Sequence, residues 1–244
     1  MNTKELRALW KEAFGDTDAF LDGFFRTGFS IDRCATAYRN GHLAGALYWF
    51  DCFWGERKLA YIYAVATAKA FRNQGVCRSL MEQCHQALSS QGYAGAVLVP
   101  VDRQVASLYE KLGYRNFGGM ERIRIQAEGA PLSLRELTAA EYAAKKEAYL
   151  DENAIRQNGK LLAFLSTYVR FYEADGLLFC VATEEDSAWF QEFLGDVQLA
   201  PGVLQTLQVS KGHLRLPDGR TPFAMYRSFT QGTDLPTYLG IALD

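Results

Sequence analysis

The sequence of 244 residues lacks any long apolar segment. No apolar run reaches the roughly 20 residues that a helix needs to cross a lipid bilayer. The first ten residues carry Lys4, Glu5 and Arg7, so they also lack the apolar core of a signal peptide. Both absences predict a cytoplasmic protein with no membrane partner.

Residues that form disulfides or bind metals are few. The sequence holds five cysteines, an odd number with no CxxC pair, and three histidines far apart along the chain. Without paired spacings, neither a disulfide framework nor a structural zinc site is expected. We therefore predict free thiols, no bound metal and a reducing, cytoplasmic environment.

The sequence also has no excess of charge of one sign. It contains 26 Lys and Arg against 28 Asp and Glu, which gives a net charge of −2, so no nucleic acid partner is expected. Apolar residues make up 49% and charged residues 22%, the balance of a folded globular protein. The length allows one large domain or two of ordinary size.

Apolar periodicity in the first half predicts a series of helices and strands. The expected helices span 3–14, 18–25, 73–90 and 105–112, and the expected strands span 34–39, 43–53, 58–67, 94–99 and 114–125. Asn40-Gly41 is a hairpin turn signal between the first two strands. The predicted fold class is α/β, with a mixed, mostly antiparallel central sheet flanked by helices.

A break in the pattern at Ala127–Pro131 predicts a boundary between two domains, 1–127 and 132–244. The second is expected to be a smaller α/β domain with helices at 139–150, 160–173 and 187–194. Its strands are expected at 177–183, 204–209, 214–216, 222–227 and 237–243. No phosphate-loop pattern occurs in this half, so a second coenzyme site is not expected.

The segment Val65–Arg78 carries the chemistry of the first half. It is a strand that enters a helix through a polar loop, and the first N–H groups of a helix have no partners within the helix. These donors and the helix dipole favour a bound anion such as a pyrophosphate. Gly75 lets the backbone approach the phosphates, and Arg72 and Arg78 flank the turn as cations.

Two motifs in this half are diagnostic together. The turn reads Arg-Asn-Gln-Gly-Val-Cys at 72–77 and follows the strand end Val-Ala-Thr at 65–67. About thirty residues later, 108–113 read Leu-Tyr-Glu-Lys-Leu-Gly. With these motifs and this order of elements, the chain resembles the GCN5-related N-acetyltransferase (GNAT) family over roughly residues 3–126. The second half resembles what accompanies the domain in some two-domain relatives, either a degenerate copy of the fold or a small α/β cap.

The resemblance implies the acyl-CoA N-acyltransferase fold with acetyl-CoA as co-substrate and no metal. The residues expected to bind the coenzyme are Val65, Ala66, Thr67, Arg72, Asn73, Gln74, Gly75, Val76, Cys77 and Arg78. Main-chain groups of the strand end would hold the pantetheine, and amides of the turn the pyrophosphate. Tyr109 would return a proton to the leaving thiolate as a general acid. A neutral amine of a small molecule or peptide would attack the thioester directly.

Two residues depart from the family's pattern. Cys77 stands where Gly or Ala is usual. Its place at a helix N-terminus predicts a lowered thiol pKa, although a small apolar side chain under the strand is the simpler interpretation. Asp102 stands where many relatives carry an Asn that binds the coenzyme, and phosphates would repel a carboxylate there.

The general base is the least defined part of the predicted site. Many relatives carry a Glu on the strand, but the matching residues 61–64 include no carboxylate. The candidates are Asp51, Glu56, a chain of water molecules, and Asp244. Asp244 would present a side-chain and a terminal carboxylate, which raise one another's pKa.

Two other functions stay open. The missing strand carboxylate also fits a non-catalytic acyl-CoA-binding module whose C-terminal domain binds a partner. The other is transfer of a longer acyl group, or of an aminoacyl group from tRNA. The version with tRNA is disfavoured because the sequence shows no basic patch.

Overall fold

The computed structural model describes residues 2–243 and contains two compact units. Unit 1 consists of Met1–Arg115 with Met225–Asp234, and unit 2 of Asn116–Ala224 with Leu235–Asp244. The chain therefore passes between the units three times: at the start of strand β5 (Arg115–Gln126), within strand β11 (Lys211–Ser228), and between Asp234 and Leu235. The division into domains 1–127 and 132–244 stays a prediction, and each unit is described by itself below.

Unit 1 contains a mixed sheet. Its strands, in order across the sheet, are β1 (Cys34–Arg39), β2 (His42–Trp54), β3 (Arg57–Thr67), β4 (Gly95–Leu98) and the last residues of β11. Neighbouring strands are antiparallel except β3 and β4, which run parallel. The predicted mixed, mostly antiparallel sheet is therefore confirmed.

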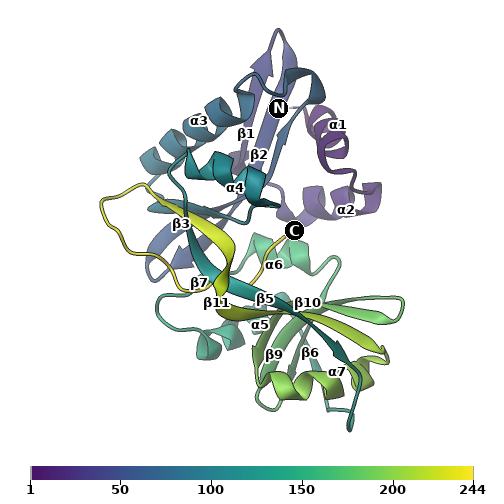
Figure 1. Cartoon of the computed structure of the whole chain (residues 1–244). Coiled ribbons are helices and arrows are strands. Elements are labelled where there is room, and N and C mark those ends of the chain that lie inside the picture. The colour runs from purple at the N-terminus through teal and green to yellow at the C-terminus, as the bar shows by residue number, and fades with distance from the viewer. Residues whose placement is uncertain (1, 244) are drawn as a thin grey trace. The chain divides into compact units, whose positions relative to one another are not determined.

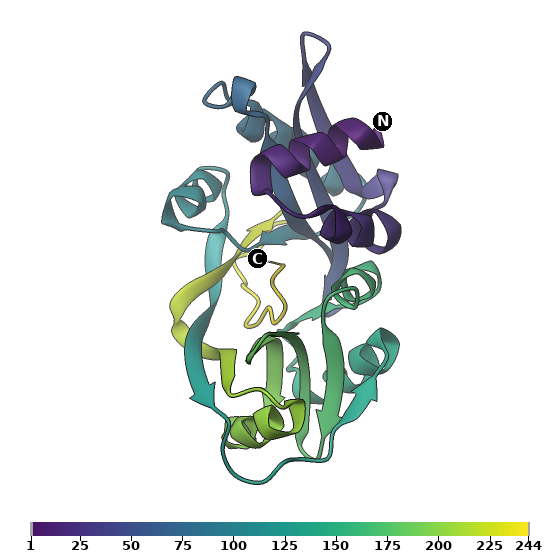
Figure 2. The same cartoon turned by 90° about the vertical axis from the view of Figure 1, so that its right-hand side faces the viewer.

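Helices cover both faces of this sheet. Figure 1 shows α1 (Thr3–Phe14) and α2 (Asp18–Gly23) on one face and α3 (Val76–Ser90) on the other. Figure 2 shows α1 lying across the strands. The remaining helical segments of this unit are α4 (Arg103–Glu110), the π-helix η1 (Phe24–Gly28) and the short turns η2 (Ile31–Arg33) and η3 (Lys69–Phe71).

The apolar stripe of α3 fixes the position of this helix. Its buried side chains recur at helical spacing and include Val76, Leu80, Met81, Cys84 and Leu88. Most of them join buried residues of β2, β3 and β4 in one core cluster. Burying a side chain of this size stabilises the fold by roughly 1.5–3 kcal/mol. The packing thereby holds the first turn of α3 close to the end of β3.

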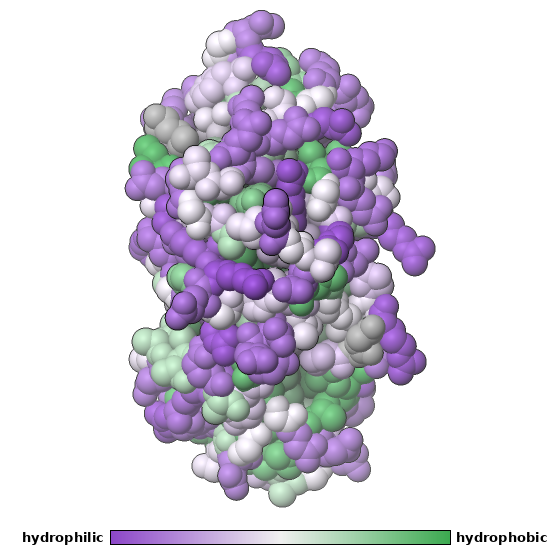
Figure 3. Space-filling model, turned by 90° about the vertical axis from the view of Figure 1, so that its left-hand side faces the viewer, coloured by the Kyte–Doolittle hydropathy of each residue, from purple (hydrophilic) through white to green (hydrophobic). Residues whose placement is uncertain are grey.

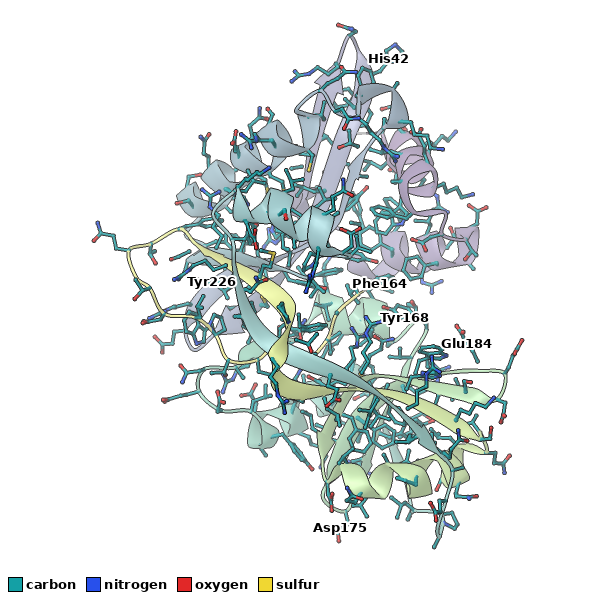
Figure 4. The ribbon with its side chains drawn as sticks, in the orientation of Figure 1. His42, Phe164, Tyr168, Asp175, Glu184 and Tyr226 are labelled. Atoms are coloured by element: carbon teal, nitrogen blue, oxygen red, sulfur yellow. The ribbon has the colours of Figure 1, made fainter. Side chains whose placement is uncertain are left out.

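Unit 2 contains the other strands of the same sheet, which continues through β11. They are β6 (Arg135–Leu137), β8 (Arg170–Ala174), β9 (Leu177–Glu184), β10 (Ser187–Gly195), the first residues of β11, and β5, which pairs with β11. The other elements are α5 (Ala139–Lys146), α6 (Lys160–Leu165), α7 (Ala200–Leu207), the short strand β7 (Ile155–Gln157), η4 (Glu147–Tyr149) and η5 (Val197–Leu199). Glu184, labelled in Figure 4, is the last residue of β9, and Asp175, also labelled there, lies in the turn between β8 and β9.

The prediction of a helix at 187–194 is wrong, because this segment is strand β10. It pairs antiparallel with β9, and the register shifts between Phe190 and Glu192. This bulge places Phe190 and Phe193, three residues apart, in the same buried cluster. A spacing of three imitates the period of a helix, so the pattern misled the prediction.

Three other segments of unit 2 also differ from the prediction. The strand expected at 204–209 is largely helix α7, which carries Pro201 in its first turn, where proline is tolerated. The helix expected at 160–173 ends at Leu165, and the chain then enters β8. Pairing of β8 with both β6 and β9 outweighs the local helical pattern. The two short strands expected at 214–216 and 222–227 are parts of the single strand β11.

The segment 237–243 is not the predicted strand. It makes one isolated bridge, between Ala154 and Tyr238. The side chain of Gln157 then holds both main-chain groups of Ile241: its Nε2 donates to the carbonyl at 2.7 Å, and its Oε1 accepts from the N–H at 2.9 Å. The end of the described chain is therefore held by a side chain and not by a strand ladder.

No helix within residues 2–243 is long and apolar enough to cross a membrane. On the face shown in Figure 3, hydrophilic residues cover most of the surface, and hydrophobic residues form separate patches among them.

Candidate functional site

The parallel strands β3 and β4 pair over only three residues. Leu59, Ala60 and Tyr61 face Gly95, Ala96 and Val97. Beyond Tyr61, β3 continues to Thr67 without a partner on β4. The last section of β3 therefore offers main-chain groups along one edge, and it contains the predicted pantetheine-binding residues 65–67.

A bulge explains why the two strands part. The register of β2 and β3 shifts between the pairs Tyr48–Tyr63 and Ala46–Ala66. Within the bulge, Ala64 has a φ of 49°, a left-handed conformation that is unusual for alanine. A bulge bends its strand and increases the twist. Strained backbone of this kind is concentrated at ligand sites.

The loop after β3 is shaped by its own side chains. Arg72 Nε donates to the carbonyl of Thr67 at 3.2 Å, and Gln74 Nε2 donates to the carbonyl of Ala70 at 2.9 Å. Asn73 has a φ of 60°, so the loop turns sharply before α3. These contacts hold the loop between β3 and α3 in one conformation.

The first turn of α3 is open to an anion. Gly75 precedes the helix with a φ of 75°, and no side chain caps it. The first bond of the helix joins the Ser79 N–H to the Gly75 carbonyl at 3.0 Å. The amides from Val76 to Arg78 come before that bond and belong to the orphan donors of a helix start. A Cβ built on Gly75 would meet no atom within 4 Å, so the space in front of these amides fits a phosphate.

Tyr109, in the last turn of α4, lies close to this turn. Its side chain is 7% exposed and packs edge-on against Tyr114, with ring centroids 5.6 Å apart. Cys77, in the first turn of α3, packs against the same core cluster. Burial, and to a lesser degree the nearby Cys77, raises the pKa of Tyr109. The phenol therefore keeps its proton at neutral pH, as a general acid must.

The pKa of Cys77 contradicts the sequence-based expectation. Burial raises the pKa of this thiol above its usual value, whereas its place at a helix start had predicted a lower one. Cys77 is therefore a small, partly buried side chain that packs under the turn. A thiolate role is not supported.

Asp102 has a structural task at this position. Its Oδ1 accepts a hydrogen bond from the Val105 N–H at 2.8 Å and caps the N-terminus of α4. Ser, Thr, Asp and Asn all serve as helix caps, so an Asp here keeps α4 and Tyr109 in place. Sequence reasoning missed this task although the capping pattern, Asp followed by a short helix, was visible.

Asp51 lies in the part of the sheet where β3 pairs with both β2 and β4. Its partner on β3 is Ala60, within the section that pairs with β4. Arg33 binds its carboxylate with two hydrogen bonds of 2.9 Å, Tyr93 donates another at 2.5 Å, and Lys58 Nζ lies 3.2 Å away. Burial alone would raise the pKa of Asp51, but these donors outweigh it and hold the pKa below its usual value. Such a carboxylate is a weak base.

Of the other candidate bases, Glu56 is not brought to this turn. Glu56 lies in the exposed turn between β2 and β3. Asp244 lies outside the described residues. In the part of the chain that the structure describes, no group of three or more His, Cys, Asp or Glu side chains is arranged to hold a metal ion.

Known proteins share the fold of this chain. Residues 2–117 match the family model of the acetyltransferase (GNAT) domain. A GCN5-related N-acetyltransferase from Kribbella flavida has a TM-score of 0.69 and 17% identity, covering 93% of this chain and 68% of that chain. One from Anabaena variabilis ATCC 29413 has a TM-score of 0.69 and 18% identity, covering 93% and 70%.

The second half also falls within this fold. A tandem GNAT protein from the clavulanic acid biosynthesis pathway has a TM-score of 0.53 and 11% identity, covering 89% of this chain and 90% of that chain. At such identities a likeness establishes the fold and not the substrate. No curated protein matches this chain.

Proposed function

We propose, from the premise that this chain belongs to the GCN5-related N-acetyltransferase family, that it moves an acetyl group from acetyl-CoA to a primary amine. The family supports acyltransferase activity, and the choice of acetyl donor and amine acceptor is our proposal. The observation that carries it is the juxtaposition in unit 1 of two features: the end of β3, which has no partner on its β4 side, and the uncapped start of α3. A thioester with a long amide-bearing arm and a pyrophosphate matches that pair of features.

Each part of the proposed site has one task. The main-chain groups of 65–67 bind the pantetheine arm as an added strand would. The amides from Gln74 to Arg78 bind the pyrophosphate, with Arg72 and Arg78 as cations at the rim. Acetyl-CoA supplies an activated acyl group, and positioning beside the amine contributes most of the acceleration. Tyr109 then donates its proton to the leaving thiolate.

The base is the open part of this proposal. The ion pairs of Asp51 speak against it, because a carboxylate held by two cations binds a proton weakly. We retain Asp244, Glu56 or water as the group that takes the proton of the amine. Asp244→Asn tests this residue: an unchanged kcat would remove its side chain from the candidates.

The acceptor and the location follow from weaker signals. We propose a small-molecule or peptide amine, because the near-neutral composition favours no polyanion. We place the reaction in the cytoplasm, since all five cysteines are free thiols, as is typical of a reducing compartment.

Thiol release from acetyl-CoA with a panel of primary amines is the direct test of the function. Turnover that depends on an amine supports it, and faster turnover with longer acyl-CoA donors would change the donor. Tight coenzyme binding without turnover on any amine would instead select a non-catalytic acyl-CoA-binding module.

Gly75→Val tests the phosphate site itself. The side chain would enter the space in front of the amides at a φ that valine disfavours. We expect coenzyme affinity, measured by calorimetry, to fall roughly 100-fold or more, which corresponds to about 3 kcal/mol of lost hydrogen bonding to the charged phosphates. Gly41→Val is the matched control, because Gly41 has a φ of 78° and equal space but lies in the hairpin turn between β1 and β2. Equal affinity in the two variants would contradict the site.

A further inference from the structure

Unit 1 carries a hollow of about 600 Å³ beside the C-terminal half of α3. The last residues of β11 form its other wall, and Figure 1 shows this end of β11 near the last turns of α3. The lining residues are Glu82, His85, Gln86, Ser89, Ser90, Arg227, Ser228 and Phe229. Those from α3 recur at spacings of three and four, so they share one face of the helix. The volume lies in the range of small-molecule sites in proteins.

The cation of this hollow, Arg227, has no carboxylate partner. Its Nη1 donates to the carbonyl of Leu112 and lies 3.1 Å from Nδ1 of His85. Burial, helped by Arg227, lowers the pKa of His85 to about 3, so the imidazole is neutral at pH 7. Because a guanidinium has only donors, Nδ1 accepts this bond, and Nε2, 2.8 Å from the Tyr114 hydroxyl, carries the ring proton. No Asp or Glu within residues 2–243 forms an ion pair with Arg227, so its charge is not neutralised.

The same contacts fix the orientation of the guanidinium. Both hydrogen bonds of Arg227 use Nη1, so Nε and Nη2 donate to no group in the described part of the chain. The side chain is half-buried at the wall of the hollow. An edge with two parallel N–H donors matches the two oxygens of a carboxylate.

The rest of the lining adds one negative charge and one aromatic ring. Glu82 is exposed on α3 and forms no ion pair among the residues described, so it favours an ammonium group and repels a second anionic group. The Phe229 ring lies 5.5 Å from that of His85 and offers an apolar surface. One cation, one anion and an aromatic ring around a single hollow match a zwitterion with an apolar side chain.

We propose that this hollow binds a free amino acid with an apolar side chain, with phenylalanine as the model occupant. Its carboxylate takes paired hydrogen bonds from Arg227, its ammonium group pairs with Glu82, and its side chain lies against Phe229. The hollow begins at Glu82, about one helical turn beyond Arg78, the last residue assigned to the pyrophosphate. The site therefore does not depend on the acyl-transfer proposal.

Calorimetric titration of the full chain with each of the standard amino acids, without coenzyme, tests the site. We expect saturable binding of apolar amino acids, phenylalanine among them. Phenethylamine lacks the carboxylate and 3-phenylpropionate lacks the ammonium group, so each is expected to bind at least tenfold more weakly. No saturable binding of any amino acid overturns the proposal. Equal affinity for 3-phenylpropionate overturns it in favour of a simple carboxylate.

Variants of exposed residues locate the ligand. The side chains of Glu82 and Ser89 make no hydrogen bond or ion pair within residues 2–243, so Glu82→Gln and Ser89→Tyr are expected to fold normally. Loss of the charge, or filling of the hollow by the tyrosine, is expected to weaken phenylalanine binding roughly tenfold or more. Arg227→Lys keeps the charge but loses the fork, and a similar decrease is expected.

The matched control is Glu121→Gln, which removes an exposed carboxylate of β5 that does not line the hollow. We expect it to leave the affinity for phenylalanine unchanged, and thermal denaturation of each variant verifies folding. Equal affinity in Glu82→Gln, Ser89→Tyr and the control overturns the proposal. Any binding that remains would then belong to another site, such as that of the amine acceptor.

Discussion

Helices α3 of unit 1 and α5 of unit 2 begin in opposite ways. Gly75 precedes α3 and no side chain caps that helix. Thr138 precedes α5 in a complete capping box: its Oγ1 accepts from the Glu141 N–H at 3.2 Å, and the Glu141 carboxylate accepts from the Thr138 N–H at 2.8 Å. One helix start leaves its donors to a ligand, and the other satisfies them within the protein.

The difference also sets the charge at each helix start. Hydrogen bonds from Thr138, first from its backbone and then from its side chain, lower the pKa of Glu141 to about 2. A carboxylate therefore already occupies the positive end of the α5 dipole. A phosphate would be repelled there, whereas Gly75 leaves the start of α3 free of negative charge. Of these two helix starts, only that of α3 has neither a side-chain cap nor an acidic residue in its first turn.

Buried polar groups show the same contrast. In unit 2, Glu192 is held by Tyr142 at 2.7 Å and by Tyr238 at 2.9 Å, with Lys146 Nζ 2.8 Å from its Oε1. In unit 1, the buried hydroxyl of Tyr48 has no hydrogen-bond partner within residues 2–243. Tyr48 pairs with Tyr63 at the bulge of β2 and β3, whereas the Glu192 cluster lies in the core of unit 2. Variants in the two units are therefore expected to affect different properties.

The largest effect is expected for Tyr109→Phe in unit 1. Loss of the proton donor is expected to lower kcat roughly 10²–10⁴-fold while coenzyme affinity and unfolding free energy stay nearly unchanged. Steady-state kinetics, calorimetry and urea denaturation measure the three quantities. The control is Tyr149→Phe, an exposed tyrosine of unit 2. A wild-type rate for Tyr109→Phe would show that solvent supplies the proton.

Lys146→Met is expected to show the reverse pattern. It leaves Glu192 as a buried charge without its cation, which costs about 3–5 kcal/mol in unfolding free energy. Adding Glu192→Gln is expected to restore part of the loss, since the remaining group is neutral. Lys145→Met is the control, because its pair with Glu173 is exposed and worth at most about 1 kcal/mol. If Lys146→Met weakened coenzyme binding as much as stability, the contrast between the units would fail.

His85 predicts a pH dependence within unit 1. Burial, helped by Arg227, lowers the pKa of His85 to about 3, and its Nε2 lies 2.8 Å from the Tyr114 hydroxyl. Between pH 6.5 and about 3, His85 is protonated in the unfolded chain but not in the folded chain. The free energy of unfolding therefore decreases as the pH is lowered through this range. The slope from this group is at most about 1.4 kcal/mol per pH unit.

Urea denaturation from pH 7 to pH 4 measures this slope. His85→Gln is expected to show a smaller decrease than the parent, and His42→Gln, at the exposed hairpin labelled in Figure 4, the same decrease. Identical slopes for His85→Gln and the parent would assign the acid sensitivity to carboxylates.

The smallest effect is expected for Thr138→Ala. Removing the cap of α5 costs about 1 kcal/mol, because the Glu141 amide loses its acceptor. Thermal or urea denaturation detects a change of this size. We expect acetyl-CoA to raise the free energy of unfolding of this variant and of the parent by the same amount, because the ligand binds in unit 1 alone. Such a result would strengthen the contrast between the two units. A selective loss of that protection would connect α5 to coenzyme binding.

Elements that local patterns control were predicted well. The apolar stripe predicted α3, and Asn40-Gly41 predicted the β1–β2 hairpin, whose turn has φ values of 51° and 78°. The two motifs also predicted the GNAT family. Predictions failed where distant contacts compete with local signals, as in β10, whose bulge imitates a helix, and in 237–243, which Gln157 holds.

The sequence by itself determined the family, the turn at Gly75 and the position of Tyr109, because these depend on residue type at fixed spacing along one helix or loop. Only the tertiary structure decided which polar groups are accessible for chemistry and which are bound within the fold. It bound Asp51 to Arg33 and Lys58, raised the pKa of Cys77 by burial and placed Trp189 against His213. The reason is physical: burial and pairing depend on strands and helices that are far apart in sequence, and those contacts set the charge and accessibility of each side chain.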